Sequence, residues 1–187
     1  MKHLILASKS PRRKELLTQL GVAYQAVPAE GEERITPGMT PEEAVRSLAR
    51  QKAEEVAARF PHSLVLGADT VVAAAGRILG KPQNRQEAAS MLRTLSGGTH
   101  KVYTGVALAE NGETDVFVSD AAVTFYQLDD DEISWYTATG EPDDKAGAYG
   151  IQGLGAVLVE RVEGDYSAVV GLPAAKVFRA LKKRGYV

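Results

Sequence analysis

The first residues whose types and spacing suit chemistry form the segment SKSPRRK at positions 8–14. A serine followed by Pro11 is typical of a helix start, so the cations that follow lie at a helix N-terminus. The helix dipole is already positive there, and each added cation costs up to about 1 kcal/mol. A bound anion makes the cations at this helix N-terminus favourable, which predicts a phosphate-binding site. A solvated basic helix start is the alternative. The groups that would bind the phosphate are two hydroxyls and two guanidinium groups, those of Ser8, Ser10, Arg12 and Arg13.

The second candidate is Asp69, a carboxylate inside the apolar segment LVLGADTVVAA at 64–74. A buried carboxylate is costly unless it is paired, protonated or bound to a metal. In the strand that this segment predicts, Gly67 and Asp69 point to the same face, and the glycine leaves room for a ligand to approach. A structural aspartate that caps a turn is the alternative.

The third candidate is Lys52, on a predicted helix that begins with a capping box at Thr40 and extends to about residue 60. Helical spacing puts Lys52 on the same apolar face as Val45 and Leu48. A lysine that snorkels to solvent is the common explanation, and a lysine that reaches into a cleft is the alternative.

Three further stretches carry weaker signals. Lys81 follows GRILG, which is one residue short of a P-loop and lacks its Ser or Thr, so we reject that motif. Glu32 and Glu33 are either solvated carboxylates or magnesium ligands. The segment EPDDKAGAYGIQGLG at 141–155 contains Gln152, whose amide can both donate to and accept from a base edge. A plain loop explains its glycines equally well.

The rest of the chain predicts the elements that must position these groups. The predicted strands span 3–7, 22–27, 64–74, 101–110 and 113–126, with a further hairpin at 156–162 and 166–170. The predicted helices span 11–20, 41–60, 84–95 and 129–138, and a last helix begins near 173. The alternation of strands and helices, with a hairpin at Asn111-Gly112, predicts an α/β fold with a mixed sheet. We expect one domain over 1–187.

Composition excludes several classes of protein. The chain has no cysteine, which excludes disulfides, thiolate catalysis and cysteine-ligated metal sites. It has no run of about 18 apolar residues, and charge follows its short apolar start at once, which predicts a cytoplasmic protein without a membrane span. A net charge of −2 and a single short basic cluster argue against nucleic-acid binding.

Taken together, the motifs resemble the Maf-type nucleoside triphosphate pyrophosphatases over nearly the whole chain. In order, they are SKSPRR at 8–13, the acidic pair at 32–33, LARQKA at 48–53, GADT at 67–70, GKP at 80–82, DKAGAYGIQG at 144–153 and GLP at 171–173. Each motif is weak by itself, whereas the ordered set is highly specific.

The resemblance implies a fold, a reaction and a set of residue roles. The fold is an elongated mixed sheet with flanking helices, like that of the inosine-triphosphate pyrophosphatases, with a cleft between two lobes. The reaction is hydrolysis of a nucleoside triphosphate to the monophosphate and pyrophosphate by a homodimer, with magnesium, manganese or cobalt. The implied roles are a proton acceptor, metal ligands and triphosphate ligands: Asp69 as the acceptor, Glu33 and Asp69 at the metal, and Ser8, Ser10, Arg13, Lys52 and Lys81 at the phosphates.

The family also divides by substrate. One branch carries Arg, Thr and Gln at three specificity positions and prefers dTTP and UTP, and Arg12, Thr70 and Gln152 match it. A branch that acts on 7-methyl-GTP has Trp after SP and GSDQ in place of GADT, and this chain has neither. The resemblance therefore implies dTTP and UTP as substrates, with modified pyrimidine nucleotides as further candidates.

Two alternatives come from the same resemblance. The family has long been linked to septum formation and arrest of cell division, which suggests a regulatory protein that acts through a protein partner. A pyrophosphatase directed at purine nucleotides is the nearest enzymatic alternative, because one fold serves both.

Overall fold

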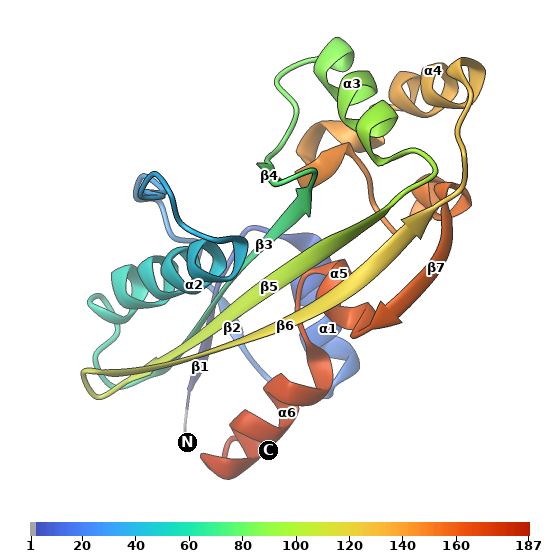
Figure 1. Ribbon diagram of the computed structural model, residues 1–187. Helices are drawn as coiled ribbons and strands as arrows, with labels where there is room; N and C mark the ends of the chain where they lie inside the picture. Colours follow the sequence, from blue (N-terminus) through green and yellow to red (C-terminus); the bar gives the residue numbers. More distant parts are fainter. Residues whose placement is uncertain (1–2) are drawn as a thin grey trace. The chain divides into compact units, whose positions relative to one another are not determined.

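Strands and helices alternate along the protein, which a computed structural model describes for residues 3–187 (Figure 1). The strands are β1 (Leu4–Ala7), β2 (Gln25–Ala26), β3 (Leu64–Ala74), β4 (Arg77–Leu79), β5 (Thr99–Glu110), β6 (Glu113–Phe125) and β7 (Val159–Gly164). The helices are α1 (Pro11–Gln19), α2 (Pro41–Ala57), α3 (Arg85–Leu95), α4 (Asp130–Ala138), α5 (Tyr166–Val170) and α6 (Ala174–Lys183). Short 3-10 helices are η1 (Glu141–Asp144), η2 (Ala146–Ala148) and η3 (Gly153–Leu158).

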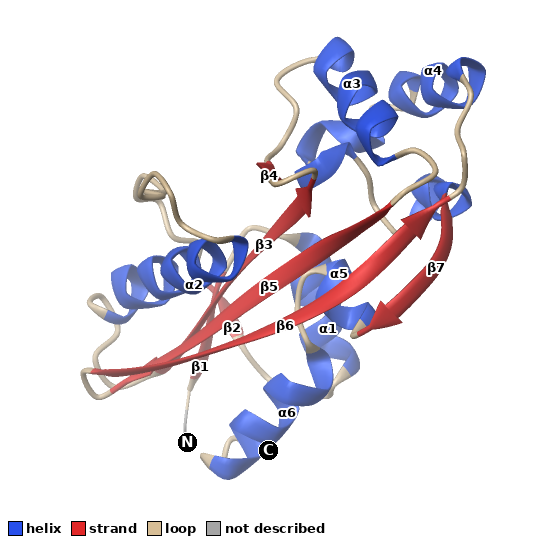
Figure 2. Ribbon diagram, in the orientation of Figure 1, coloured by secondary structure: helices blue, strands red, loops and turns tan. Residues whose placement is uncertain are grey.

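The strands form one mixed sheet. Its order within residues 3–187 is β2-β1-β3-β5-β6-β7, with β4 paired to β3. Strand β1 is parallel to β2 and β3, whereas β4 is antiparallel to β3 and β7 is antiparallel to β6. The predicted α/β fold, a mixed sheet with flanking helices, is therefore confirmed (Figure 2). The cleft between two lobes stays a prediction.

The chain divides into two compact units. Unit 1 contains the described chain through Asp69 together with Thr104–Ser119 and Gly171–Val187. Unit 2 contains Thr70–Tyr103 and Asp120–Val170. Strands β3, β5 and β6 each contribute residues to both units. The predicted site residues also fall into both units, with Asp69 in unit 1 and Thr70 in unit 2.

Helix α2 and the strands β1, β3 and β5 contribute the residues of a core cluster in unit 1. That core consists of small or aliphatic buried side chains: Ile5, Ala7, Ala49, Ala53, Val56, Val65, Ala107 and Ala109. The helix approaches the strand so closely that a Cβ atom on Gly67 would lie 2.5 Å from Ala49 O and 2.7 Å from Ala53 N. The helix backbone therefore fills the space beside Gly67, and the prediction that a ligand approaches there is wrong.

The end of unit 2 differs from the sequence prediction. The sequence predicts a hairpin at 156–162 and 166–170, but β7 pairs with β6, and 166–170 is the helix α5 (Figure 2). The side chain of Asp165 accepts hydrogen bonds from Ala168 N at 3.2 Å and from Ser167 Oγ at 2.6 Å. This local capping starts a helix in a segment whose composition favours a strand.

Several predicted elements are confirmed. Strand β3 has the predicted bounds, and the turn Asn111-Gly112 has φ values of 53° and 83°, as the favoured two-residue hairpin requires. The predicted caps of α1, α2 and α3 are Ser10, Thr40 and Asn84. The sequence did not indicate β4 or the 3-10 helices. Within residues 3–187, every helix is too short or too polar to cross a membrane.

Candidate active site

The charged centre of unit 1 is Lys52, whose ammonium group bridges two carboxylates. Lys52 Nζ donates a hydrogen bond to Asp69 Oδ1 and lies 2.9 Å from Glu33 Oε1. The side chains of Lys52 and Asp69 are only 16% and 12% exposed, whereas that of Glu33 is 57% exposed. Pairing with Lys52 offsets the cost of the Asp69 carboxylate in an apolar strand, while Glu33 keeps contact with solvent.

The close packing of α2 against β3 explains why Lys52 contacts Asp69. Lys52 lies between Ala49 and Ala53, the two residues whose backbone covers Gly67. Asp69 is two residues further along the strand and therefore points to the same face as Gly67. The predicted place of Lys52 on the apolar face of α2 is thus confirmed, and its ammonium reaches Asp69 instead of snorkelling away.

Two side chains one helical turn apart fix the loop of Glu33 along α2. The Glu55 carboxylate accepts hydrogen bonds from the N–H groups of residues 30 and 31, at 2.8 Å and 3.0 Å. The Gln51 amide accepts from Arg34 N at 3.1 Å and donates to Arg34 O at 2.8 Å. The loop is therefore held on both sides of Glu33, which directs that carboxylate to Lys52. Neither anchor was indicated by a sequence motif of its own, although both lie on α2 at helical spacing.

Replacing Glu55 by Gln is expected to loosen this loop. The amide nitrogen of Gln cannot accept a hydrogen bond, so one of the N–H groups of residues 30 and 31 loses its partner. Hydrogen–deuterium exchange at those two amides should accelerate about tenfold, because local opening becomes easier. Glu54→Gln is the matched control, since the Glu54 carboxylate pairs with Arg50 on the exposed surface of α2. Equal exchange in the two variants would contradict the anchoring role.

The two serines of SKSPRRK shape the start of α1. Ser10 Oγ accepts a hydrogen bond from Arg13 N at 3.5 Å and caps the helix. Ser8 Oγ accepts from Ser10 N at 3.1 Å and lies 3.4 Å from a guanidinium nitrogen of Arg13. Arg12 is partly exposed at the first turn. The geometry thus presents hydroxyls, a helix N-terminus and cations together, and phosphate binding by them stays a prediction.

Arg13 points into unit 1. Its Nε donates a 2.7 Å hydrogen bond to the carbonyl of Gly171, in the GLP motif at 171–173. Burial lowers the pKa of the guanidinium below its ordinary value, and the charges of Asp69 and Glu33 counteract this shift. Both carboxylates are therefore close enough to act on Arg13. The charged cluster of unit 1 consists of two cations and two carboxylates: Arg13, Lys52, Glu33 and Asp69.

Unit 2 carries the other three predicted residues. The carbonyl that precedes Lys81 accepts a 3.0 Å hydrogen bond from Gly147 N, so the loop of Lys81 lies beside the glycine-rich segment. A Cβ atom on Gly147 would lie 3.0 Å from the methyl groups of Val72, which shares a strand face with Thr70. Gln152 follows in the same segment and is partly buried. The segments that carry Thr70, Lys81 and Gln152 thus lie next to one another. The approach of these three residues to the charged cluster stays a prediction.

The sequence matches the family described as Maf-like protein over residues 3–184. This chain belongs to that family. A dTTP/UTP pyrophosphatase from Bacillus velezensis is 51% identical over 182 residues, covering 97% of this chain and 96% of that protein. A dTTP/UTP pyrophosphatase from Halalkalibacterium halodurans is 53% identical over 186 residues, covering 100% and 98%. A solved HAM1 protein from Coxiella burnetii is 19% identical with a TM-score of 0.47, covering 68% of this chain and 75% of that chain.

Membership of the Maf-like family confirms the resemblance that the ordered motifs indicated. The match includes every motif from SKSPRR to GLP, so the residues of both units fall within it. The homodimer, the cytoplasmic location and the lack of nucleic-acid binding stay predictions.

The two carboxylates of the charged cluster are of the type that binds a divalent cation, and metal binding by them stays a prediction. Glu33 and Asp69 both contact one ammonium group, so their oxygens already converge on a positive centre. Magnesium is typically bound by one or two carboxylates together with substrate phosphates, which matches this donor set. Within residues 3–187, no group of three or more acidic or histidine side chains is arranged to hold a metal ion. Substrate oxygens or water would therefore have to supply the remaining ligands.

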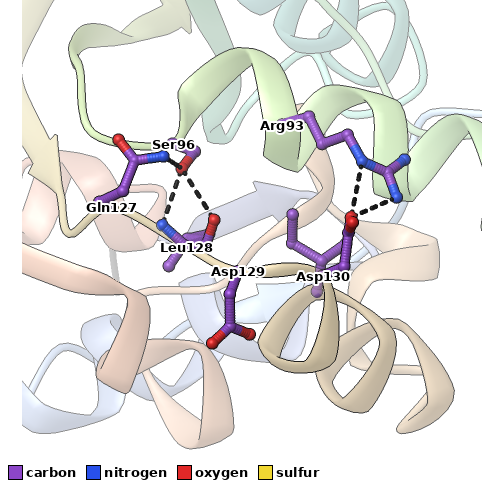
Figure 3. Close-up of a pocket in the computed structure, with 7 residues that line it drawn as sticks. Arg93, Ser96, Gln127, Leu128, Asp129 and Asp130 are labelled. Atoms are coloured by element: carbon purple, nitrogen blue, oxygen red, sulfur yellow. Dashed lines mark hydrogen bonds and ion pairs between the residues drawn. The ribbon is translucent and has the colours of Figure 1, made fainter.

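A separate hollow of about 510 Å³ lies in unit 2, between α3 and the start of α4 (Figure 3). Its polar groups bind one another: Ser96 Oγ accepts from Leu128 N at 2.8 Å, and Arg93 pairs with Asp130 at 2.9 Å. The predicted site residues are absent from its lining. The Arg93–Asp130 pair links α3 to α4, and the Ser96 contact links the residues beside these helices. The hollow is therefore not part of the candidate active site.

Proposed function

We propose that the protein hydrolyses dTTP and UTP to the nucleoside monophosphate and pyrophosphate. The observation that carries this proposal is the charged cluster, in which Lys52 bridges Asp69 and Glu33. Such a cluster combines cations that attract phosphate with carboxylates able to hold a metal ion and orient water. Relatives about half identical to this chain over nearly its full length are named dTTP/UTP pyrophosphatases, which supports the same substrates here.

In this proposal, each residue of the charged cluster has a role. Lys52 and Arg13 attract the triphosphate and stabilise the negative charge that builds on the leaving pyrophosphate. Asp69 accepts a hydrogen bond from water, orients it towards the α-phosphorus and takes its proton. The bond from the water oxygen to the α-phosphorus forms as the bond from that phosphorus to the bridging oxygen breaks. When bound, a divalent cation held by Glu33 and Asp69 neutralises further phosphate charge.

The remaining predicted residues complete this account. Ser8, Ser10 and Lys81 contact the triphosphate, and the helix N-terminus beside the serines favours its negative charge. Arg12, Thr70 and Gln152 select the pyrimidine base. A site built to hydrogen-bond one base leaves polar groups unpaired with another, which penalises the wrong nucleotide.

A panel of nucleoside triphosphates tests the proposal. Purified protein is incubated with dTTP, UTP, CTP, ATP, GTP or 7-methyl-GTP and with magnesium or manganese, and pyrophosphate and orthophosphate are both measured. Pyrophosphate from dTTP and UTP, with little from purines, is the expected result. Release from purine nucleotides alone would overturn the base preference. No pyrophosphate from any nucleotide would overturn the reaction itself.

Gln152→Glu is expected to change the substrate preference. The amide can donate to O4 and accept from N3–H of uracil, whereas a carboxylate only accepts. The ratio of kcat/KM for UTP to that for CTP should therefore fall about tenfold. Gln86→Glu, at an exposed position on α3, makes the same charge change as a control. An unchanged ratio in Gln152→Glu would argue against a base-reading role.

A further inference from the structure

The loop that carries Gln152 is hydrogen-bonded at both ends to side chains outside the loop. Residues 150–155 form this loop, the base loop. Its first N–H group donates to Tyr136 Oη at 3.1 Å. Its last two N–H groups donate to the two carboxylate oxygens of Glu141, at 3.0 Å and 2.9 Å. Gln152 lies between these anchors, so its position depends on them.

The two anchors also support each other. Tyr136 Oη donates to Glu141 Oε1 at 2.9 Å, and the Tyr136 ring is fully buried. Lys145 Nζ donates to the Glu141 carbonyl at 2.6 Å. Burial alone would raise the pKa of the Glu141 carboxyl, but its hydrogen bonds outweigh burial and hold that pKa below its ordinary value. The carboxylate therefore stays charged at neutral pH, as an acceptor of three hydrogen bonds must.

The ends of the base loop lie close together. A Cβ atom on Gly155 would overlap the carbonyl oxygen of Gly150 and lie 2.6 Å from Tyr136 Oη. Just before the loop, the Tyr149 hydroxyl lies 2.8 Å from Nε2 of the buried His100. The base loop is thus a closed turn held between the buried Tyr136 side chain and the Glu141 carboxylate.

We propose that Glu141 and Tyr136 are positioning residues that set pyrimidine selectivity by holding the base loop, an inference that rests on the proposed role of Gln152. Reading a base edge requires a hydrogen-bonding group held within a fraction of an ångström, and a loose loop loses that discrimination. Most of the proposed triphosphate ligands are in unit 1, and the loop of Lys81 in unit 2 is bonded to Gly147, outside the base loop. Loosening the base loop should therefore affect recognition of the base more than phosphate binding.

Glu141→Gln and Tyr136→Phe test this proposal. The first variant replaces one acceptor oxygen by a donor, and the second removes the hydroxyl while keeping the buried ring. In both, the ratio of kcat/KM for UTP to that for CTP should fall about tenfold, and the base-loop amides should exchange faster with deuterium. Glu160→Gln, at an exposed position on β7, is the control and should change neither quantity.

The possible outcomes separate this inference from the proposed function. A variant that lowers both kcat/KM values equally, or that exchanges faster with an unchanged ratio, would overturn the positioning role. Wild-type protein that releases no pyrophosphate would overturn the proposed function instead. In that case the affinities for the α,β-methylene analogues of UTP and CTP are compared. A wild-type preference for the UTP analogue that both variants retain would overturn the positioning role, and a reduced preference would support it.

Discussion

Asp69→Asn is expected to lower kcat for pyrophosphate release from dTTP by about a thousandfold or more, because the variant lacks the carboxylate that takes the proton from water. Asparagine has nearly the same shape as aspartate, and its side-chain oxygen can still accept from Lys52. Lys52 also keeps its contact with Glu33 at 2.9 Å, so no unpaired buried charge is created. The variant should therefore fold, and loss of activity should reflect chemistry.

Controls separate loss of chemistry from loss of structure. Asp120→Asn makes the same change in a carboxylate that pairs with Lys101 on the surface, and it should retain activity. Thermal unfolding of Asp69→Asn should occur within a few degrees of the wild type, since a buried charge is exchanged for a neutral acceptor. Near-normal turnover in Asp69→Asn would contradict the role assigned to this residue.

Gly67→Ala is expected to destabilise the protein by about 3 kcal/mol or more, at the upper end for overpacked cores. The new methyl group would lie 2.5 Å from Ala49 O, 2.7 Å from Ala53 N and 3.0 Å from Ala53 Cβ. Two of these are backbone atoms of α2 and cannot rotate away, so the whole helix must shift. Lys52 lies on the same turn, so its contact with Asp69 should be disturbed as well.

Chemical denaturation measures this effect. Gly80→Ala is the matched control, because nothing lies within 4 Å of its new methyl group and its backbone conformation suits alanine. Gly105→Ala should behave like Gly67→Ala, since its methyl group would overlap the carbonyl group of Val45 on the same helix. An unfolding midpoint of Gly67→Ala equal to that of the wild type would contradict the close packing of α2 against β3.

Local signals made most of the elements predictable. Strand β3 is an apolar run bounded by turn residues, and the caps at Ser10, Thr40 and Asn84 act over three residues. The segment 166–170 was mispredicted because Asp165 starts a helix through contacts that composition does not reveal. The close approach of the α2 backbone to Gly67 also leaves no pattern in the sequence. The strand that contains Gly67 was therefore predicted correctly, whereas the reason for a glycine at this position was not.

The residues of the candidate site could be predicted from their types, whereas the contacts between them could not. An isolated carboxylate in a strand and a lysine on an apolar helix face each signal an unusual environment, but only the structure pairs Asp69 with Lys52. The anchors Gln51, Glu55 and Glu141 bind backbone N–H groups of loops, and such contacts leave no periodic pattern in a sequence. Their only signal was proximity to motifs, as with Glu141 at the start of EPDDKAGAYGIQGLG.

The most direct test of the central claim is hydrolysis of dTTP in water enriched in oxygen-18, with mass spectrometry of both products. Attack on the α-phosphorus predicts one labelled oxygen in dTMP and unlabelled pyrophosphate. Label in pyrophosphate would show attack on the β-phosphorus, and labelled orthophosphate with dTDP would show attack on the γ-phosphorus. Either of these results would contradict the reaction proposed for the charged cluster.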